Sequence, residues 1–320
     1  MSSTAAPDVR GVTEAPLSRI ATPLITLWIV WGSTYMGIAL VVQSMPPLAG
    51  AGTRFLAASA ALALVVLLLR GPRVFRVTRS QIRGAVLMGT LILSVGIGIL
   101  SLAQRYVPSS IAALIVSVMP LWIIIFRLRA GDRPSRMTLS GVAVGLLGLV
   151  LMLLPGGTAP VGDASTAQVA LWSLAITFGS FCWAFFSWRS TRYDQPKDPL
   201  VTTVIELVTA GVVLTTVGLL LGERWTPSAY TSASWAGWAY LVLASAVAYS
   251  AYVWLIGNAP MSLVSTYAYI NPVIAVLLGF FILKEQITTD VILGLTIVVG
   301  GVILVVSGER RPKLLPLEPS

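Results

Sequence analysis

The sequence predicts an all-α integral membrane protein with ten transmembrane helices in two inverted five-helix repeats. The first observation is composition: 56% of the 320 residues are hydrophobic and 10% are charged, whereas about 25% of a soluble domain is charged. The mean hydropathy is +0.88. The second observation is an internal repeat, because a constant shift of 152 residues places Trp31 on Trp183 and Pro120 on Pro272.

The same shift relates other residues of the two halves. Two further proline pairs share it: Pro47 with Pro199, and Pro108 with Pro260. Arg54 and Glu206, the two charges deep in apolar segments, are also 152 residues apart. Prolines and tryptophans also recur at helix ends and interfaces, but one shared shift indicates a duplication. In a membrane protein, a duplication is typical of a transporter whose substrate site lies between the halves.

Apolar runs long enough to cross a membrane, which takes about 20 residues, follow one another along the chain. In the first half we expect spans at 22–42, 47–69, 82–104, 108–127 and 138–155. In the second half we expect spans at 168–189, 199–221, 235–257, 261–283 and 289–307. The connections between them are short, so no soluble catalytic domain fits between the spans.

These spans divide the chain into a polar tail at 1–21, a first repeat at 22–155, a second repeat at 168–307 and a tail at 308–320. Five spans is an odd number, so the second repeat must lie upside down relative to the first. The fifth and tenth spans carry small-residue faces: Gly141, Gly145 and Gly148, and Gly294, Gly300 and Gly301. Such faces let helices approach closely, so we expect these spans to pack on each other or on a second copy.

The basic residues predict the orientation. With the N-terminus inside, the inner segments carry 17 of the Lys and Arg residues and the outer segments carry three, Arg105, Arg224 and Lys284. Because short cytoplasmic loops are enriched in Lys and Arg, both termini are expected in the cytoplasm. The net charge of +9 therefore reflects membrane orientation and does not indicate a nucleic-acid partner.

Several motifs, in this order and spacing, resemble a known family. The first half has Trp31-Gly32-Ser33-Thr34-Tyr35, Arg54-Phe55, Gln104-Arg105-Tyr106-Val107-Pro108 and Met119-Pro120-Leu121. The second half has Asn258-Ala259-Pro260, Asn271-Pro272-Val273 and Leu283-Lys284-Glu285. Over nearly the whole chain this pattern resembles the drug/metabolite transporter superfamily, specifically its EamA-type branch. The resemblance implies bacterial inner-membrane transport, often export, of small metabolites or drugs. Within the branch, the many aromatic residues most resemble the amino acid exporters of the YddG type.

Prolines and one amide mark the expected centre of the molecule. Pro120 and Pro272 fall at the middle of their spans, where a proline kinks a helix and frees a carbonyl group. Transporters bind substrate near the bilayer midplane, often at broken helices. Asn271, which precedes Pro272, is a strong polar group at this depth. Its amide is expected to bind either substrate or a neighbouring helix.

Helical spacing places aromatic and hydroxyl side chains on common faces. Trp31 and Tyr35 share one face of the first span, and Tyr267 and Asn271 are one turn apart in the ninth. The expected substrate-binding residues are Trp31, Tyr35, Ser94, Trp183, Ser245, Tyr249, Tyr252, Tyr267 and Asn271. Together they predict a central chamber that suits a small amphipathic ligand better than an ion. Aromatic stripes also arise from plain helix packing, which is the alternative interpretation.

Arg54 and Glu206 need partners, because a charge within a span is costly unless it is paired or faces water. Their depths differ by about 10 Å at 1.5 Å rise per residue, which argues against a direct pair. Arg54 could neutralise a substrate carboxylate, and Glu206 is the acid placed to carry a proton. Both could instead stabilise the packing of helices.

The sequence argues against several other functions. It has no histidine and one cysteine, Cys182, so no metal site, disulfide framework or cofactor is expected. The acids are scattered, which disfavours a membrane-embedded enzyme, and no phosphate-binding loop is present. We expect a carrier for an amino acid-like small molecule, surrounded by lipids, as a monomer or weak dimer. A cationic-drug exporter is the alternative, and a channel or lipid scramblase is a further one.

Overall fold

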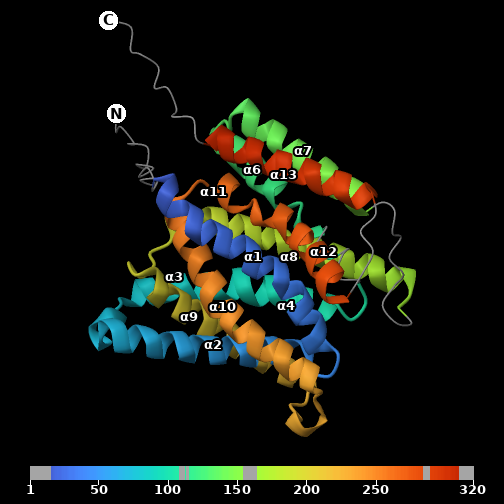
Figure 1. Cartoon of the computed structure of the whole chain (residues 1–320). Helices are drawn as coiled ribbons and strands as arrows, with labels where there is room; N and C mark the ends of the chain where they lie inside the picture. The colour runs from blue at the N-terminus through green and yellow to red at the C-terminus, as the bar shows by residue number, and fades with distance from the viewer. Residues whose placement is uncertain (1–15, 108–111, 113–114, 154–163, 284–288, 310–320) are drawn as a thin grey trace, which may run out of the picture.

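A computed structural model describes residues 16–107, 112, 115–153, 164–283 and 289–309, and every regular element in these ranges is helical. The first half contains α1 (Leu17–Val42), α2 (Pro47–Arg70), η1 (Pro72–Phe75), α3 (Arg79–Met88), η2 (Gly89–Ser94), α4 (Val95–Ala103), α6 (Met119–Arg129) and α7 (Arg136–Leu153). The second half contains α8 (Thr166–Arg189), η4 (Ser190–Arg192), α9 (Pro199–Leu220), η5 (Pro227–Ala229), α10 (Ser232–Asn258), α11 (Met261–Val264), α12 (Tyr267–Leu283) and α13 (Thr289–Glu309). Figure 1 shows their arrangement.

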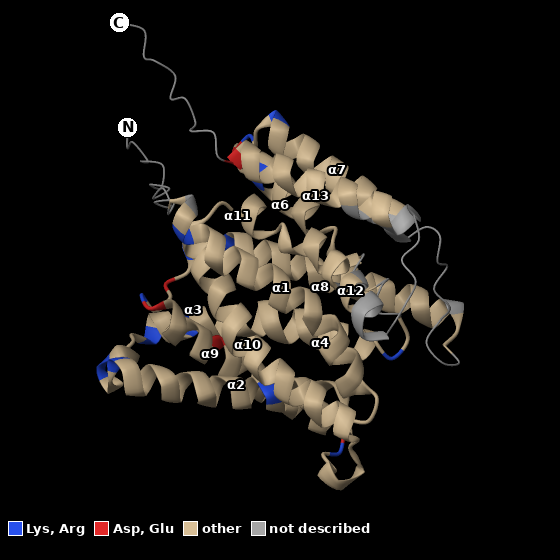
Figure 2. Cartoon of the chain, viewed as in Figure 1, with Lys and Arg blue, Asp and Glu red and all other residues tan. Residues whose placement is uncertain are grey.

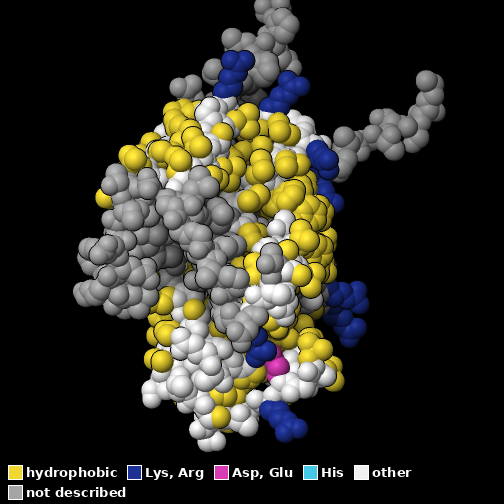
Figure 3. Space-filling view, turned by 90° about the vertical axis from the view of Figure 1, so that its right-hand side faces the viewer, with side chains coloured by type: hydrophobic (Ala, Val, Ile, Leu, Met, Phe, Trp, Pro, Cys, Tyr) yellow, Lys and Arg dark blue, Asp and Glu magenta, His cyan; other side chains and the backbone are white. Residues whose placement is uncertain are grey.

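Seven helical segments in the described ranges are long and apolar enough to cross a membrane. Their outer surfaces carry large apolar side chains: Leu68, Leu69 and Leu220 are 75%, 78% and 80% exposed. Figure 3 shows hydrophobic side chains gathered over much of one face of the molecule. Such a surface is explained by contact with lipid. The prediction of an all-α integral membrane protein is therefore confirmed, while the number of ten spans stays a prediction.

The packing of one half has a counterpart in the other. Helix α2 packs along α9 and α7 packs along α13, so two helix pairs join equivalent elements of the halves. Helix α1 packs on α10, and its equivalent α8 packs on α4 and η2. In Figure 1 the α7–α13 pair lies at the top and α2 with α9 at the bottom, with the other long helices between them. Each half therefore contributes one helix to the α2–α9 pair and one helix to the α7–α13 pair, on opposite sides of the other long helices.

Glycines set the closest of these contacts. A Cβ atom on Gly148 would lie 2.7 Å from the Val298 backbone nitrogen, and one on Gly301 would lie 2.6 Å from the Gly145 nitrogen. Only glycine permits the backbones of α7 and α13 to approach this closely. Of the two arrangements that the glycine faces allowed, the structure shows these helices packed on each other.

The third span is helical throughout but changes its helix type at the middle. It runs from α3 through η2, a π-helical segment at Gly89–Ser94, into α4. A Cβ atom on Gly89 would lie 2.6 Å from the carbonyl oxygen of Glu206, so α9 crosses close to the start of this segment. The wider π turn rotates the side chains that follow it relative to a regular α-helix.

The ninth span is interrupted near its start. The expected helix 261–283 is two helices, α11 and α12, which Ser265 and Thr266 separate. The serine hydroxyl donates to the carbonyl of Ser262 at 3.0 Å, and the threonine hydroxyl donates to that of Leu263 at 2.6 Å. These local bonds compete with continuation of the helix.

The structure places Pro120 directly after an interruption of the fourth span, not inside a helix. Helix α6 begins at Met119, after a turn at Ser117 and Val118, so Pro120 lies in the first helical turn. The missing N–H group of a proline costs nothing there. Pro272 does lie inside a helix, α12. Most of residues 108–114, which begin the expected fourth span, lie outside the described residues.

Basic side chains gather at one end of the bundle, where α2 ends and α3 begins (Figure 2). Arg70, the last residue of α2, pairs there with Asp198, the N-cap of α9. Helix α1 begins and α13 ends on this same side of the molecule (Figure 1). We call this side the arginine-rich end.

Candidate functional site

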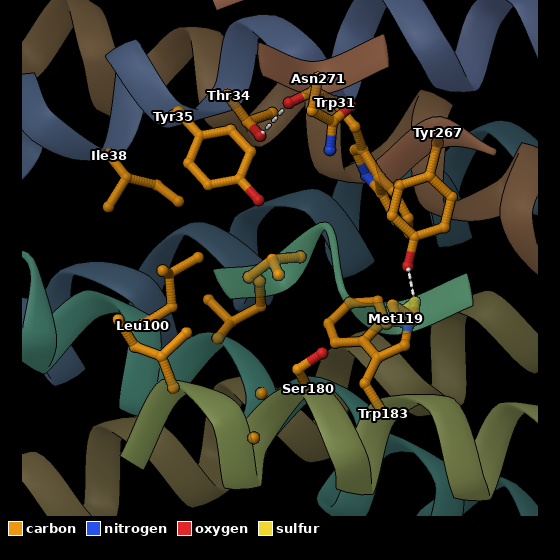
Figure 4. Close-up of a pocket in the computed structure, with 15 residues that line it drawn as sticks. Trp31, Thr34, Tyr35, Ile38, Leu100, Met119, Ser180, Trp183, Tyr267 and Asn271 are labelled. Carbon is orange, nitrogen blue, oxygen red and sulfur yellow. Dashed lines mark hydrogen bonds between the residues drawn. The ribbon is translucent and has the colours of Figure 1, made fainter. Parts of the chain in front are cut away.

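A cavity of about 80 Å³ lies at the centre of the helices, between α1, α4, α6, α8 and α12 (Figure 4). Because a cavity needs about 10–15 Å³ to hold one water, this cavity has room for several waters or a small ligand. Its lining residues are Trp31, Thr34, Tyr35, Ile38, Gly96, Ile97, Leu100, Val116, Met119, Ile176, Gly179, Ser180, Trp183, Tyr267 and Asn271.

Helix α1 supplies one wall of the cavity through a face of i, i+3, i+4 and i+7 residues. Trp31, Thr34, Tyr35 and Ile38 lie on this face. The Thr34 hydroxyl donates to the Trp31 carbonyl at 2.7 Å, which satisfies the threonine within its own helix. The Tyr35 ring projects into the space between α1 and the opposite helices α4 and α8 (Figure 4).

Trp31 is the centre of an aromatic cluster. Its ring centroid lies 5.5 Å from that of Trp183, 4.9 Å from that of Tyr252 and 4.6 Å from that of Tyr267. The ring planes of Trp31 and Trp183 meet at 83°, the edge-to-face geometry that aromatic pairs prefer. The two tryptophans that the 152-residue shift relates therefore touch each other beside the cavity.

Hydrogen bonds hold this cluster in place. The Trp183 indole nitrogen donates to the Tyr252 hydroxyl at 2.7 Å, and the same hydroxyl bonds Ser187. The Tyr267 hydroxyl donates to the Met119 sulfur at 2.8 Å (Figure 4). Tyr252 is fully buried and does not line the cavity. Its predicted role as a wall residue is therefore corrected: it packs behind Trp31 and orients Trp183.

The described lining residues of the cavity extend toward one end of the bundle. Its lining runs forward along α1 to Ile38 and backward along α8 to Ile176, which leads away from the arginine-rich end. On that far side, the rings of Tyr106 and Trp172 stack with centroids 5.5 Å apart. On the other side of the cavity, the rings of Trp31, Trp183 and Tyr252 contact one another.

Ion pairs and hydrogen bonds connect several helices at the arginine-rich end. Arg127 of α6 bonds the carboxylates of Asp132 at 2.8 Å and Glu309 at 2.9 Å. Glu309, the last residue of α13, also accepts from the hydroxyls of Ser262 at 2.6 Å and Thr138 at 3.1 Å. This polar cluster of five residues joins α6, α7, α11 and α13.

Two polar atoms that line the cavity have no hydrogen-bond partner among the described residues. They are the Asn271 side-chain oxygen and the Ser180 hydroxyl, both buried. The Asn271 side chain lies beside the Tyr35 hydroxyl. Buried polar groups are rarely left unpaired in folded proteins, so these atoms are places where a ligand or water would bind.

A second, smaller cavity of about 40 Å³ adjoins the first. Both cavities are lined by Trp31, Thr34, Ile38, Ile97 and Trp183, and the second adds Arg54, Phe55, Leu93, Ser245 and Tyr249. Ser245 and Tyr249 thus lie near the expected chamber, although the Ser245 hydroxyl donates to the carbonyl of Leu241 at 2.6 Å.

The two charges within spans are both buried, with 4% of Arg54 and 3% of Glu206 exposed. The ion pairs in the described part of the chain do not include one between them, in agreement with their expected difference in depth. The carboxylate of Glu206 faces the Tyr249 hydroxyl, while Arg54 lies on the second cavity.

Comparison with known proteins identifies the family. The EamA-like transporter family matches residues 21–154 and again residues 170–307. The chain belongs to the EamA-like transporter family. The two matches divide the chain at the same place as the repeat in its sequence.

Curated relatives cover nearly the whole of this EamA-like transporter. The protein named as the uncharacterized inner membrane transporter YedA of Escherichia coli (strain K12) is 37% identical over 297 residues, 92% of each chain. Protein PecM of Dickeya dadantii is 26% identical, over 91% of this chain and 94% of its own. A solved crystal structure with 19% identity superposes with a TM-score of 0.75, over 92% of this chain and 98% of its own, and supports the fold. The resemblance to YddG-type exporters stays a prediction.

The sequence prediction of the lining residues of this EamA-like transporter included a further residue, besides Tyr252, that lines neither cavity, and it missed others. Ser94 lines neither cavity, because its hydroxyl donates to the Gly89 carbonyl at 3.2 Å inside the π-helical segment. Ser180 was missed, although it lies three residues before Trp183 on the same helix face. Gly96 was also missed: a Cβ atom there would lie 2.5 Å from the Trp183 ring. The sequence alone gives no signal for that contact.

Proposed function

We propose that this EamA-like transporter is a secondary carrier that exports amino acids, aromatic or apolar ones included, or related small metabolites, across a bacterial inner membrane by alternating access. The observation that carries the proposal is the cavity itself. It is lined by the repeat-related Trp31 and Trp183 and combines aromatic walls with two polar atoms, on Asn271 and Ser180, that have no partner among the described residues. Such a lining binds the apolar body of a small molecule and orients its polar groups.

The one-sided shape of the cavity favours a carrier over a channel. A channel needs a continuous path, whereas here the aromatic cluster and the Arg127 polar cluster lie between the cavity and the arginine-rich end. If both termini are cytoplasmic, as the basic residues predict, the cavity extends toward the outer side. The structure would then represent the outward-facing state of the transport cycle.

The charges near the cavity bear on the alternative, a cationic-drug exporter. A cationic drug would need an acid beside the aromatic rings. None of the described residues that line either cavity is Asp or Glu, and Glu206 contacts Tyr249, which lines the second cavity. We therefore propose an amino acid-like substrate first, with Glu206 as the site of proton coupling.

The test is transport by the purified full chain in proteoliposomes. Uptake and efflux of a panel of radiolabelled amino acids would be measured with and without a pH gradient, beside a panel of cationic dyes. We expect saturable transport of aromatic or branched apolar amino acids. Transport of the dyes alone would replace the proposal with the drug exporter, and flux that never saturates would indicate a channel.

A further inference from the structure

Arg54 differs from the other buried cation that the structure describes. Arg127, which is 9% exposed, is matched by two carboxylates, those of Asp132 and Glu309. Arg54 is more deeply buried, at 4%, yet the structure gives its guanidinium group no hydrogen bond and no ion pair with any described residue. Its Nε atom is fully enclosed without a partner. Its guanidinium carbon lies 4.7 Å from the centroid of the Phe55 ring, a cation–π contact.

A buried arginine without a partner would be stabilised by a bound anion. Arginine does not lose its proton in proteins, so a neutral form cannot relieve the burial. Leaving a charge unpaired within a membrane span costs several kcal/mol. The repeat-related acid does not supply the partner, since Glu206 faces Tyr249 and forms no ion pair with Arg54.

The cavity next to Arg54 supplies the place for that anion. Arg54 lines the smaller cavity together with Thr34 and Tyr249, and none of the described residues that line either cavity carries a carboxylate. The smaller cavity shares Trp31, Thr34 and Trp183 with the larger one. A molecule whose apolar body occupies the aromatic cavity could therefore extend a charged group to the guanidinium.

We propose that Arg54 forms a carboxylate-binding subsite of the substrate cavity, so that the transporter selects small carboxylates with an aromatic or apolar body. The planar guanidinium offers parallel N–H donors that match the two oxygens of a carboxylate. The same charge repels an organic cation. The inference rests on the proposed function, and it names the group of the substrate that this chain would recognise.

The test compares ligands that differ only in charge. Phenylacetate, its uncharged amide phenylacetamide and the cation phenethylamine have the same ring, and their binding to the purified full chain in detergent can be measured by ligand-induced shifts in melting temperature. Phenylalanine and phenylalaninamide form a second matched pair. A charged hydrogen bond contributes about 1.5–3 kcal/mol, so each carboxylate is expected to bind about 10- to 100-fold more tightly than its amide.

Substitutions at Arg54 assign the preference to this residue. Arg54→Gln should remove the preference for the carboxylates and leave binding of phenylacetamide unchanged. Arg54→Lys should keep part of the preference, since it retains the charge without the planar fork. The control is Arg105→Gln, which removes an exposed charge elsewhere in the chain and should change nothing. An Arg54→Gln protein that still prefers phenylacetate would overturn the subsite.

A measurement on the unmodified protein covers the case in which Arg54→Gln does not fold. Phenylglyoxal reacts with arginine side chains, and mass spectrometry can follow its reaction at Arg54. Phenylacetate should protect Arg54, and phenylacetamide should not. Equal reaction with and without phenylacetate contradicts the proposal. If chloride protects Arg54 while phenylacetate and phenylalanine do not, the proposal is also contradicted, because the anion bound at Arg54 would then be an inorganic ion.

The results separate this inference from the proposed function. If amino acids are not transported in proteoliposomes but the Arg54-dependent preference holds, the substrate is a different carboxylate and the subsite stands. If amino acids are transported and Arg54→Gln binds phenylalanine as the wild type does, the function stands and the subsite is wrong.

Discussion

The hydroxyl of Ser117 donates a 2.7 Å hydrogen bond to the carbonyl of Ala268. That carbonyl lies four residues before Pro272, which has no N–H group to bond it within α12. Ser117 itself belongs to the turn that precedes α6, at Ser117 and Val118. The irregular segment of one half thus satisfies the backbone that the proline leaves open in the other half, next to the cavity.

This bond gives a prediction for stability. Ser117→Ala leaves a buried carbonyl without its donor, so we expect a loss of about 1–3 kcal/mol in the free energy of unfolding. Thermal melting in detergent measures it as a lower melting temperature. The matched control is Ser250→Ala, because the Ser250 hydroxyl donates to the Ala246 carbonyl of its own helix and its loss should have little effect. Equal melting of both variants would show that the Ser117 bond does not stabilise the fold.

The second prediction concerns the tryptophan pair. We expect Trp31→Ala and Trp183→Ala each to reduce transport far more than they reduce the amount of folded protein. Truncating a packed tryptophan can cost about 3–5 kcal/mol, so the melting of each variant must be measured on the same samples. Phe178→Ala is the control, since it removes an aromatic ring of α8 that is 58% exposed.

The melting data decide between the two roles of these rings. Normal melting with a lost ligand-induced shift would mean that they bind substrate. A lost melting transition together with lost transport would mean that they only pack. Normal transport by both variants would contradict the central cavity as the substrate site.

The third prediction tests proton coupling. If transport is coupled to protons, Glu206→Gln should abolish flux driven by a pH gradient and leave substrate exchange partly intact, because the amide keeps the shape but cannot release a proton. Proteoliposome assays with and without the gradient measure both activities. Asp194→Asn, which neutralises an exposed acid, should leave both unchanged. Gradient-driven flux that survives in Glu206→Gln would assign Glu206 to helix packing.

The fourth prediction concerns orientation. Fluorescent-protein fusions at the C-terminus should fluoresce, and alkaline phosphatase fusions there should be inactive, because the basic residues predict a cytoplasmic end. Fusions truncated at Thr226, between α9 and α10, should behave in the opposite way. An active phosphatase at the C-terminus would contradict the inverted ten-span topology.

Much of the fold could be predicted, because hydrophobic length and the 152-residue repeat are properties of the sequence itself. The interruption at Ser265 and Thr266 could not, since neither residue is a strong helix breaker and local hydroxyl bonds made the difference. Near Pro120, the interruption lies at Ser117 and Val118, and the proline falls in the first turn of the next helix, where it is well tolerated.

The candidate site shows the same division. Helical spacing was enough to bring Trp31, Tyr35 and Asn271 to one cavity. Spacing failed for Ser94, because the π-helical segment at Gly89–Ser94 shifts the face of the third span. It also could not tell that Tyr252 lies behind the wall, since packing residues and lining residues of one helix face have the same period.

The ion pair between Arg127 and Glu309 has no equivalent in the repeat, because the 152-residue shift pairs these two positions with Gly279 and Gly157, whereas it pairs Asp132 with Lys284. A carrier built from inverted repeats reaches its second state when the halves exchange their conformations. Closure at the opposite end would then lack the ion pairs that Arg127 makes here. The two end states should therefore be unequally populated without substrate. The empty carrier would rest in the state described here, and the return of the unloaded protein would limit its rate of turnover.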